Sequence, residues 1–235
     1  MAAMTYGNEF VVNHLPLKEG ENTIEAVATD TAGMTETAST TIYATTPQKH
    51  IKITANAESA IPPVEITLTI ESSLDLTNAN LTYTGPAEVE FLSSSLSEYR
   101  VGITTEGIYY FTISAQAPNG DPYSDTIAIV IFSEAELDAL LRSKWETMRY
   151  KLKNGDIEGA LVVFHESRKA HYREIFNALS SLLPGIAEEM SDIQLIKYTR
   201  NSAIYDIRTI REGTEYSFQL LFTKDQNGIW TIGSY

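Results

Sequence analysis

The chain has 235 residues, contains no cysteine and carries a formal net charge of −14 at pH 7. The absence of cysteine excludes a disulfide framework and a thiolate metal site. Because the chain is acidic and has no run of ~20 apolar residues, we expect neither nucleic-acid binding nor insertion into a membrane.

Residues 1–46 have the pattern of short antiparallel strands. Ile24, Ala26 and Ala28 alternate with residues of the opposite face between turns at 18–22 and 30–33, and a threonine-rich strand follows. Such alternation is typical of half-buried strands. The segment has room for three or four strands, whereas a two-sheet sandwich of this kind needs about seven. We therefore predict a partial β module whose other strands precede residue 1; the alternative is that these strands join the next domain.

Residues 47–133 form the second predicted domain, after a linker at 45–48. Prolines and glycines at 62–63, 85–86 and 118–122 mark turns between short apolar runs. The clearest pair is a hairpin in which apolar residues alternate at 109–113 and again at 127–131. Seven strands in such a short stretch predict an all-β sandwich. The expected strands are 50–56, 64–71, 81–84, 88–93, 98–104, 107–117 and 125–132.

At Ser133 the pattern changes to helical spacing. Ser133 and Glu136 form a capping box, and apolar residues then recur every three or four positions, so we predict a helix that ends at Asn154-Gly155. Asp156 caps a second helix, a third is expected at 167–183, and Pro184-Gly185 interrupts it before 186–190. Four strands should follow, at 193–200, 202–212, 216–224 and 229–235, with a turn at 225–228. This order predicts an α+β domain at 134–235, with helices packed on an antiparallel sheet.

Two segments resemble bacterial immunoglobulin-like surface modules. Residues 10–44 resemble the end of such a module through Leu17-Lys18-Glu19-Gly20-Glu21-Asn22 and Asp30-Thr31-Ala32-Gly33, with Met34 where the family commonly has Asn. Residues 49–132 resemble a second module, of the polycystic-kidney-disease-like kind, through the Gly107-Ile108-Tyr109-Tyr110-Phe111 hairpin. The resemblance implies an immunoglobulin-like sandwich and says nothing about chemistry.

Residues 134–235 resemble the nuclear-transport-factor-2-like superfamily, whose fold is a cystatin-like cone. The matching features are Trp145, the Asn154-Gly155-Asp156 turn, the helix that holds Tyr172, and the ending Asp225-Gln226-Asn227-Gly228-Ile229-Trp230-Thr231-Ile232. The resemblance implies a sheet whose last strand faces the helices. Families with this cone include isomerases, dehydratases and non-catalytic modules, so the fold leaves the activity open.

The predicted cone interior is the place for a ligand pocket. Asp206 or a histidine could add a polar group there, but Tyr205 and Asp206 are neighbours on a strand and must face opposite sides. If Tyr205 lies in the core, Asp206 is solvated. Core packing of the rings is the favoured interpretation. The candidate lining residues are Trp145, His171, Tyr172, Tyr205, Phe218 and Trp230.

One turn has the composition of a cation site. Asn119, Asp121 and Asp125 could offer oxygen atoms to Ca²⁺, but such a site needs six to eight oxygens and about three are visible. A plain turn, which Asn and Asp stabilise without an ion, is therefore favoured. No nucleotide-binding motif or histidine metal motif occurs, so we expect no other cofactor.

These features favour a non-catalytic structural or interaction region of an exported bacterial protein, in which sandwich modules present a C-terminal recognition domain. The expected partner is a protein or carbohydrate at the cell surface, and the expected location is extracellular, cell-surface or periplasmic, although residues 1–10 do not form a signal peptide. The alternative is a small-molecule-binding or enzymatic cone of the isomerase or dehydratase kind. A third hypothesis is a subunit that forms a homodimer through its C-terminal domain.

Overall fold

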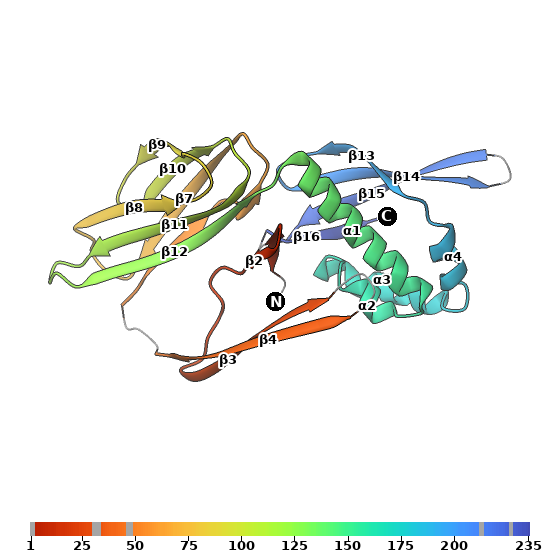
Figure 1. Cartoon of the computed structure of the whole chain (residues 1–235), viewed down its shortest axis with the longest axis horizontal. Coiled ribbons are helices and arrows are strands. Elements are labelled where there is room, and N and C mark those ends of the chain that lie inside the picture. The colour runs from red at the N-terminus through yellow and green to blue at the C-terminus, as the bar shows by residue number, and fades with distance from the viewer. Residues whose placement is uncertain (1–2, 30–33, 46–48, 212–213, 226–227) are drawn as a thin grey trace. The chain divides into compact units, whose positions relative to one another are not determined.

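The computed structural model describes residues 3–29, 34–45, 49–211, 214–225 and 228–235. The fold is mostly β, with several sheets and a few helices (Figure 1). It divides into two compact units. The first unit ends at Glu134 and the main part of the second begins at Ala135, one residue after the predicted start of the C-terminal domain at residue 134. The predicted turn at 30–33, most of the linker at 45–48 and the centre of the turn at 225–228 lie outside the described residues.

Two four-stranded sheets enclose the core of the first unit. One sheet has the order β5-β7-β10-β9 and the other β6-β12-β11-β8; the short β6 pairs parallel with β12, and the remaining pairs are antiparallel. The bounds are β5 Ile51–Ala55, β6 Ser59–Ala60, β7 Val64–Ser72, β8 Asn78–Thr84, β9 Glu90–Ser94, β10 Glu98–Ile103, β11 Gly107–Gln116 and β12 Pro122–Ile131. The seven predicted strands all appear, with shifted ends, and β6 was not predicted.

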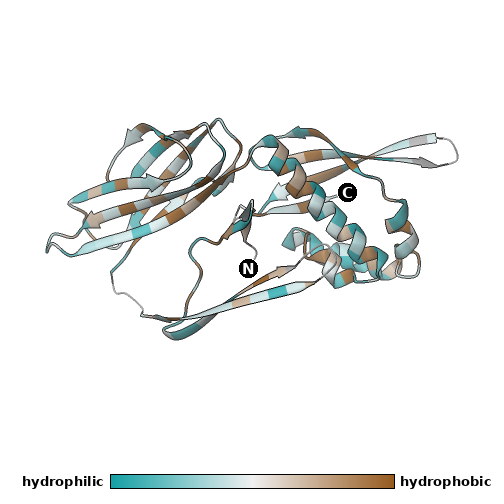
Figure 2. Ribbon diagram, in the orientation of Figure 1, coloured by the Kyte–Doolittle hydropathy of each residue, from teal (hydrophilic) through white to brown (hydrophobic). Residues whose placement is uncertain are grey.

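Apolar residues alternate with polar or exposed residues along β11, and the apolar ones supply the core between the two sheets. Tyr109, Phe111 and Ile113 are fully buried, while Tyr110 and Ser114 on the opposite face are exposed. Figure 2 shows the resulting brown bands along β11 and β12. Alternation was also predicted for β12, but there every residue from 127 to 131 is buried. The reason is that part of the N-terminal segment contacts β12 as well.

This N-terminal contact corrects the predicted partial module. Strands β1 (Met4–Tyr6) and β2 (Glu9–Val11) form a hairpin, and β1 contacts β12. The Asn13 amide then donates to Ala128 O at 2.9 Å and accepts from Ala128 N at 2.8 Å, as a neighbouring strand would. Residues 4–14 therefore join the next domain, which was the less favoured alternative.

The rest of that segment is a two-stranded ribbon of its own. Strand β3 (Gly20–Thr29) pairs only with β4 (Thr35–Ala44) among the described residues. All residues of β4 except Ala44 are exposed, including Ile42 and Tyr43. The predicted alternation appears in β3, where Ile24 and Ala26 are half-buried while Glu25 and Val27 are exposed, but it has no counterpart in β4.

Replacement of Asn13 tests its role on the β12 edge. We expect Asn13→Ala to lower the free energy of unfolding by about 1–3 kcal/mol, because it leaves the buried Ala128 N–H and C=O without their partner. Urea titration followed by circular dichroism measures the change. The exposed Asn8, in the turn between β1 and β2, provides the control. An effect of Asn13→Ala no larger than that of Asn8→Ala would contradict the assignment.

The second unit has helices on a four-stranded antiparallel sheet in the order β13-β14-β15-β16. This is the predicted α+β order of elements. Among the described residues, none of its helices is both long enough and apolar enough to span a membrane. The bounds are α1 Glu134–Lys153, α2 Ile157–Leu161, α3 Glu166–Ala178, α4 Leu183–Glu189, β13 Ile193–Tyr198, β14 Ser202–Arg211, β15 Thr214–Lys224 and β16 Trp230–Ser234.

The helices follow the predicted signals with one correction. Helix α1 buries the apolar residues at helical spacing, and Asp156 caps α2 by accepting from Gly159 N at 2.8 Å. The predicted helix at 167–183 is two helices, because α3 ends at Ala178 and a new helix begins at Leu183. Pro184 lies in the first turn of α4, where its missing N–H costs nothing, so it starts a helix and does not interrupt one.

The two sides of β16 differ in what they pair with. The outer edge of β16 is covered by residues 163–165, because His165 N donates to Ile232 O at 2.9 Å and Ile232 N donates to Val163 O at 2.8 Å. On its other side β16 pairs with β15 only over Leu221–Lys224. The remaining part of β15, from Thr214 to Leu220, extends past β16.

Candidate functional site

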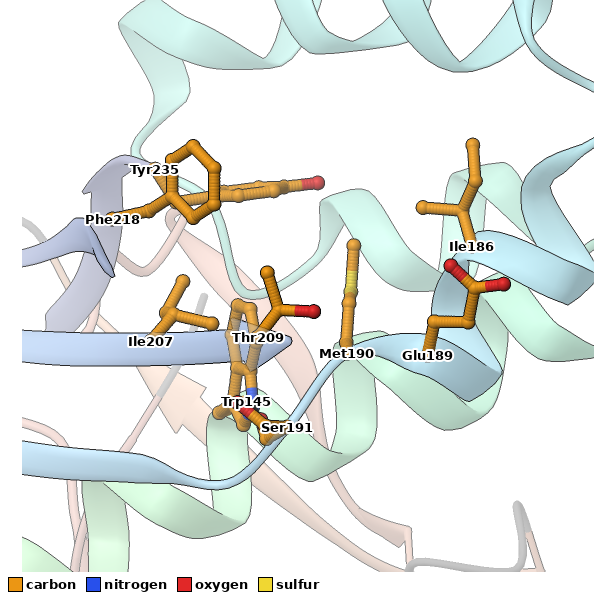
Figure 3. A pocket seen from close by; sticks show the side chains of 9 residues that line it. All are labelled: Trp145, Ile186, Glu189, Met190, Ser191, Ile207, Thr209, Phe218 and Tyr235. Carbon is orange, nitrogen blue, oxygen red and sulfur yellow. Dashed lines mark hydrogen bonds between the residues drawn. The ribbon is translucent and has the colours of Figure 1, made fainter. Parts of the chain in front are cut away.

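A small apolar pocket in the second unit is the candidate site. Its volume is about 160 Å³. Figure 3 shows Ile207, Thr209 and Phe218 of the sheet on one side and residues from the end of α4 on the other. The nine lining residues are Trp145, Ile186, Glu189, Met190, Ser191, Ile207, Thr209, Phe218 and Tyr235.

Helical and strand geometry bring these side chains together. Leu183 and Ala187 are the buried face of α4, so Ile186 and Met190, one turn apart, lie on the adjacent side and line the pocket. On the sheet, Ile207 of β14 lies directly opposite Phe218 of β15. Phe218 is about half exposed, at 51%, and therefore belongs to the wall and not to the core.

Trp145 forms a fixed part of the wall. Its Nε1 donates to Ser191 O at 3.1 Å, and its ring meets Tyr235 edge-on at 5.7 Å between centroids. The indole is 1% exposed. A side chain with its polar atom already paired and its ring packed is a preorganised surface for a ligand, and it offers no group for acid–base chemistry.

The interior next to the pocket is filled with rings. The ring of Tyr172 stacks on that of Tyr235 with 5.3 Å between the centroids, and the centroid of the Phe164 ring lies 4.6 Å from that of Tyr172. The Tyr172 hydroxyl donates to Tyr235 O at 3.1 Å and accepts from Tyr235 N at 3.0 Å. Tyr172 is therefore a core residue that does not line the pocket, in line with the favoured interpretation of core packing.

Tyr205 is also absent from the pocket. It is fully buried, and its hydroxyl donates to Asp138 Oδ1 at 2.8 Å while Arg142 Nε donates to Asp138 Oδ2 at 2.7 Å. Burial, and then the hydrogen bond with Asp138, raise the pKa of the Tyr205 hydroxyl. The neutral phenol thus connects the sheet to α1.

Asp206 lies on the opposite face of the sheet, as strand geometry requires, but it is not solvated as expected. Its carboxylate accepts from Arg208 Nε at 2.7 Å and from the Ser217 hydroxyl, and it is nearly buried. The Arg208 hydrogen bond, followed by that of Ser217, lowers its pKa. A second neighbour on the same strand, Arg208, and a residue of the adjacent strand, Ser217, thus enclose a carboxylate that the sequence pattern leaves to water.

Trp230 packs under a lysine and does not line the pocket. Lys224, its cross-strand partner, holds its Nζ 4.9 Å from the Trp230 ring centroid. Burial, and then the positive charge of Arg200, lower the pKa of Lys224 to about 8. The Trp230 Nε1 is buried without a hydrogen-bond partner among the described residues.

The Lys224 amine gives a pH dependence with a definite sign. Because its folded pKa of about 8 lies below the unfolded value of about 10.4, the unfolded chain binds more protons between these values. Stability should therefore rise as the pH rises from about 8 to about 10.4. The pKa of Lys144 is lowered by burial as well, so the two amines share this rise.

Lys224→Met should reduce that rise and leave a remainder from Lys144. Lys197→Met, at an exposed position of β13, provides the control substitution. Urea midpoints measured from pH 7 to 10.5 test this expectation, and the ¹³Cε shift of Lys224 reports its titration directly. A Lys224 amine that titrates above pH 10 would contradict it.

His171 is exposed and is not part of the pocket. It lies on the exposed face of α3, whereas the side chain of its neighbour Tyr172 is buried. The other histidine of this region, His165, caps α3, where its side chain accepts from Ser167 N. Of the six predicted lining residues, the structure thus brings together Trp145 and Phe218.

The three predicted calcium ligands do not meet. Asn119 and Asp121 hydrogen-bond to each other at 2.7 Å in the exposed turn between β11 and β12. Asp125 lies further along β12, where its Oδ2 accepts from Ile53 N at 2.8 Å and contacts His14 Nε2 at 3.0 Å. Within the described part of the chain, no group of three or more His, Asp or Glu side chains is arranged to hold a metal ion.

The first unit has a hollow of about 490 Å³, lined by three loops, by Tyr6 at the end of β1 and by Tyr110 of β11. Its walls come from the turn at 7–9, the loop at 84–86 and the turn at 106–108. It is an open depression whose acidic lining residues, Glu9 and Glu106, are exposed. We therefore take the pocket of the second unit as the candidate site.

Sequence reasoning missed seven of the nine lining residues. The sequence could have indicated Ile186 and Met190, because two apolar residues four positions apart lie on the same face of a short helix. Nothing in the sequence marks Glu189, Ser191 or Thr209 as pocket residues, since their role depends on how α4 ends against the sheet.

Comparisons with known proteins give little further information. No protein-family model matches the chain, and no curated protein matches it. Among solved structures, the chain is similar to one described as an "Ntf2 like protein involved in plasmid conjugation", with 9% sequence identity and a TM-score of 0.24 over 80% of this chain and 78% of that chain. A likeness with so low a TM-score carries no argument about this protein.

Proposed function

We propose that this chain is a non-catalytic interaction region of an exported bacterial protein. In this proposal an immunoglobulin-like sandwich carries a nuclear-transport-factor-2-like domain, which binds a partner protein by holding one of its apolar side chains in the pocket. The sequence resemblances support the family assignments and the location outside the cytoplasm. The two sheets around one core and the order of helices and strands in the second unit agree with these assignments.

One observation carries the proposal: among the described residues of the second unit the interior rings pack against one another, and the pocket beside them is small and apolar. Pockets for drug-sized molecules have volumes of roughly 300–1,000 Å³, whereas this one has about 160 Å³. A cavity of roughly 150 Å³ accepts a group of the size of benzene. The pocket therefore suits a single leucine, isoleucine or phenylalanine side chain better than a whole substrate.

The chemistry of the wall supports binding without catalysis. Glu189 is the only lining residue with a carboxylate, and it is exposed at the rim. The buried hydroxyls of Tyr172 and Tyr205 already have partners and lie outside the pocket. A carbohydrate would need several polar groups to bind its hydroxyls, and this wall has few, so a protein partner is favoured over a glycan.

The test fills the pocket. A library of synthetic peptides with a central Leu, Ile or Phe serves as the probe, and fluorescence anisotropy measures binding to the full chain. Ile186→Trp should weaken the binding of any selected peptide at least tenfold, because the larger ring occupies the pocket. Leu182→Trp is the matched control, since Leu182 is exposed one turn earlier and does not line the pocket.

Two outcomes would contradict the proposal. One is equal peptide binding by the two tryptophan variants, which would place the interaction elsewhere. The other is turnover of a small substrate that Ile186→Trp abolishes and Leu182→Trp preserves, which would establish the enzymatic alternative.

A further inference from the structure

The hollow of the first unit lies beside an uncharged outer sheet face. Its volume of about 490 Å³ falls within the range of roughly 300–1,000 Å³ that is usual for small-molecule sites. The walls are the turn between β1 and β2, the end of β8 with the loop that follows, and the start of β11. Tyr110 of β11, which is 37% exposed, joins the hollow to the outer face of its sheet.

Close packing fixes two of these walls. A Cβ atom at Gly85 would lie 2.4 Å from Cδ1 of Tyr109, so the loop after β8 rests directly on that ring. Gly107 has a φ of +132°, and a Cβ atom there would lie 2.6 Å from Cγ of Pro86. Tyr109 is fully buried, and its hydroxyl donates to Thr105 O at 3.0 Å. The two loops are therefore held against the core and against each other, which preorganises the hollow for a ligand.

The third wall is the closed end of a hairpin. The turn at 7–8 joins Tyr6 to Glu9, whereas β1 begins at Met4, at the other end of the hairpin. The Tyr6 ring packs against the ring of Phe132 with 6.2 Å between the centroids. The wall is thus a turn anchored on the sandwich, and the chain enters the hairpin at the end away from the hollow.

The outer face of β8, β11 and β12 continues from the hollow without a charged side chain (Figure 1). Tyr110 and its partner Thr84 form the row nearest the hollow. Two further rows of exposed or half-buried hydroxyl and amide residues cross the three strands: Thr82, Thr112 and Thr126, and then Asn80, Ser114 and Ser124.

The outer face of the other sheet is charged. Glu65 and Glu71 of β7 are exposed there, and so are Glu98 and Arg100 of β10, with Arg100 paired to Glu65. The chain as a whole has a net charge of −14. The lack of charge on the face beside the hollow is therefore a local property of that face, and depletion of charged residues is a mark of binding surfaces.

The lining of the hollow selects the class of ligand. Its charged residues are Glu9 and Glu106, which are exposed and have no ion pair among the described residues. They repel an anion, and exposed ion pairs give a cation little affinity in water. Neutral hydroxyl groups can donate to both carboxylates, and the apolar face of a sugar ring can lie on a tyrosine ring.

The outer face favours the same class. Its small hydroxyl and amide side chains offer many hydrogen-bond partners to a polyhydroxylated chain. They offer no large anchor to a protein partner, whose binding energy usually comes from buried aromatic or arginine side chains.

We propose that the first unit binds a neutral oligosaccharide, with one sugar in the hollow that Tyr6 and Tyr110 line and the following sugars along the rows of threonine and serine on the outer face. Glu9 and Glu106 accept hydrogen bonds from hydroxyl groups of the first sugar. This site is separate from the pocket of the second unit and does not depend on the proposed function.

Neutral hexasaccharides of glucose, mannose, xylose and N-acetylglucosamine provide the probes, with hexagalacturonate and hexalysine as charged references. Isothermal titration calorimetry with the full chain measures affinity, and ¹H–¹⁵N spectra locate the site. At least one neutral probe should bind, with amide shifts at the hollow and the adjacent outer face. Its affinity should change less than twofold between low and high salt, because no charge is paired. Hexagalacturonate should not bind.

Two pairs of variants test the residues. Tyr110→Ala should weaken sugar binding at least tenfold, and Tyr43→Ala is the control, since Tyr43 is 77% exposed on β4 and lies outside the hollow. Ser114→Lys places a long side chain on the uncharged face and should weaken binding at least fivefold. Its control is Thr69→Lys, at an exposed position on the outer face of the other sheet. Circular dichroism establishes that each variant is folded.

Each contrary outcome is distinct. Failure of all neutral probes to bind overturns this proposal, and so does sugar binding that Tyr110→Ala and Ser114→Lys leave unchanged. Hexalysine that binds the hollow more tightly than any sugar, and that Glu106→Gln releases, would make the ligand a basic peptide and overturn it as well. Ile186→Trp should preserve sugar binding; a loss would place the sugar in the pocket of the second unit and overturn the proposal. The proposed function is tested with peptides at that pocket, so the two fail by different results.

Discussion

Trp145→Ala should lower the free energy of unfolding of the second unit by about 3–5 kcal/mol, the range for removal of a buried aromatic side chain. Trp145 is 1% exposed, packs edge-on against Tyr235, and supplies one wall of the pocket. Its removal leaves a cavity that the adjacent helices cannot close and releases Ser191 O from its hydrogen bond. Urea titration by far-ultraviolet circular dichroism, with amide exchange of α1 and β14, measures the loss.

Trp145→Phe separates packing from hydrogen bonding. It retains most of the apolar surface but not the Nε1 donor, so we expect a loss of about 1–2 kcal/mol. If Trp145→Ala cost no more than Trp145→Phe, the indole would not be the packed wall residue that its burial indicates.

Phe111→Ala should destabilise the first unit by about 3–5 kcal/mol. Phe111 is fully buried between the two sheets and contacts the rings of Tyr83 and Tyr109 at 6.0 and 6.4 Å. Its loss opens a void in the middle of the core, where no side chain has room to rotate inward without leaving another void. Amide exchange of β10 and β11 in the full chain reports the effect on this unit.

Phe91→Ala is the matched control for Phe111→Ala. Phe91 lies on β9, is 46% exposed and touches Tyr83 from the outside. We expect this change to cost less than about 1 kcal/mol, since the ring gives up little buried surface. Equal effects of the two substitutions would show that the core does not lie between the sheets as described.

Local patterns predicted most elements well because each pattern reflects a local constraint. Period-two alternation in β11 and the helical spacing in α1 correspond to faces that are buried in the structure. The capped start of α2 at Asp156 is another such signal. The failures occurred at Pro184, which starts a helix as readily as it ends one, and in β12, which is buried on both faces near its end.

The predicted pocket illustrates a different limit. Aromatic residues were chosen because rings line pockets, yet Tyr172, Tyr205 and Trp230 pack in the core and His171 faces solvent. A sequence identifies rings that must be buried but not which of them borders a space. That depends on where α4 ends relative to β14 and β15, and so on contacts between elements distant in the chain.

The sequence by itself determined the acidic character of the chain, the all-β first part, the change to helices at Ser133 and the order of the last four strands. Each follows from composition or from the repeat of apolar residues along a few neighbouring positions. Only the tertiary structure decided that residues 4–14 pack beside β12, that Asp206 is enclosed by Arg208 and Ser217, and that β15 extends past β16 beside the pocket. The physical reason is that burial and strand pairing depend on which surfaces meet, and that choice is made by the packing of the whole chain.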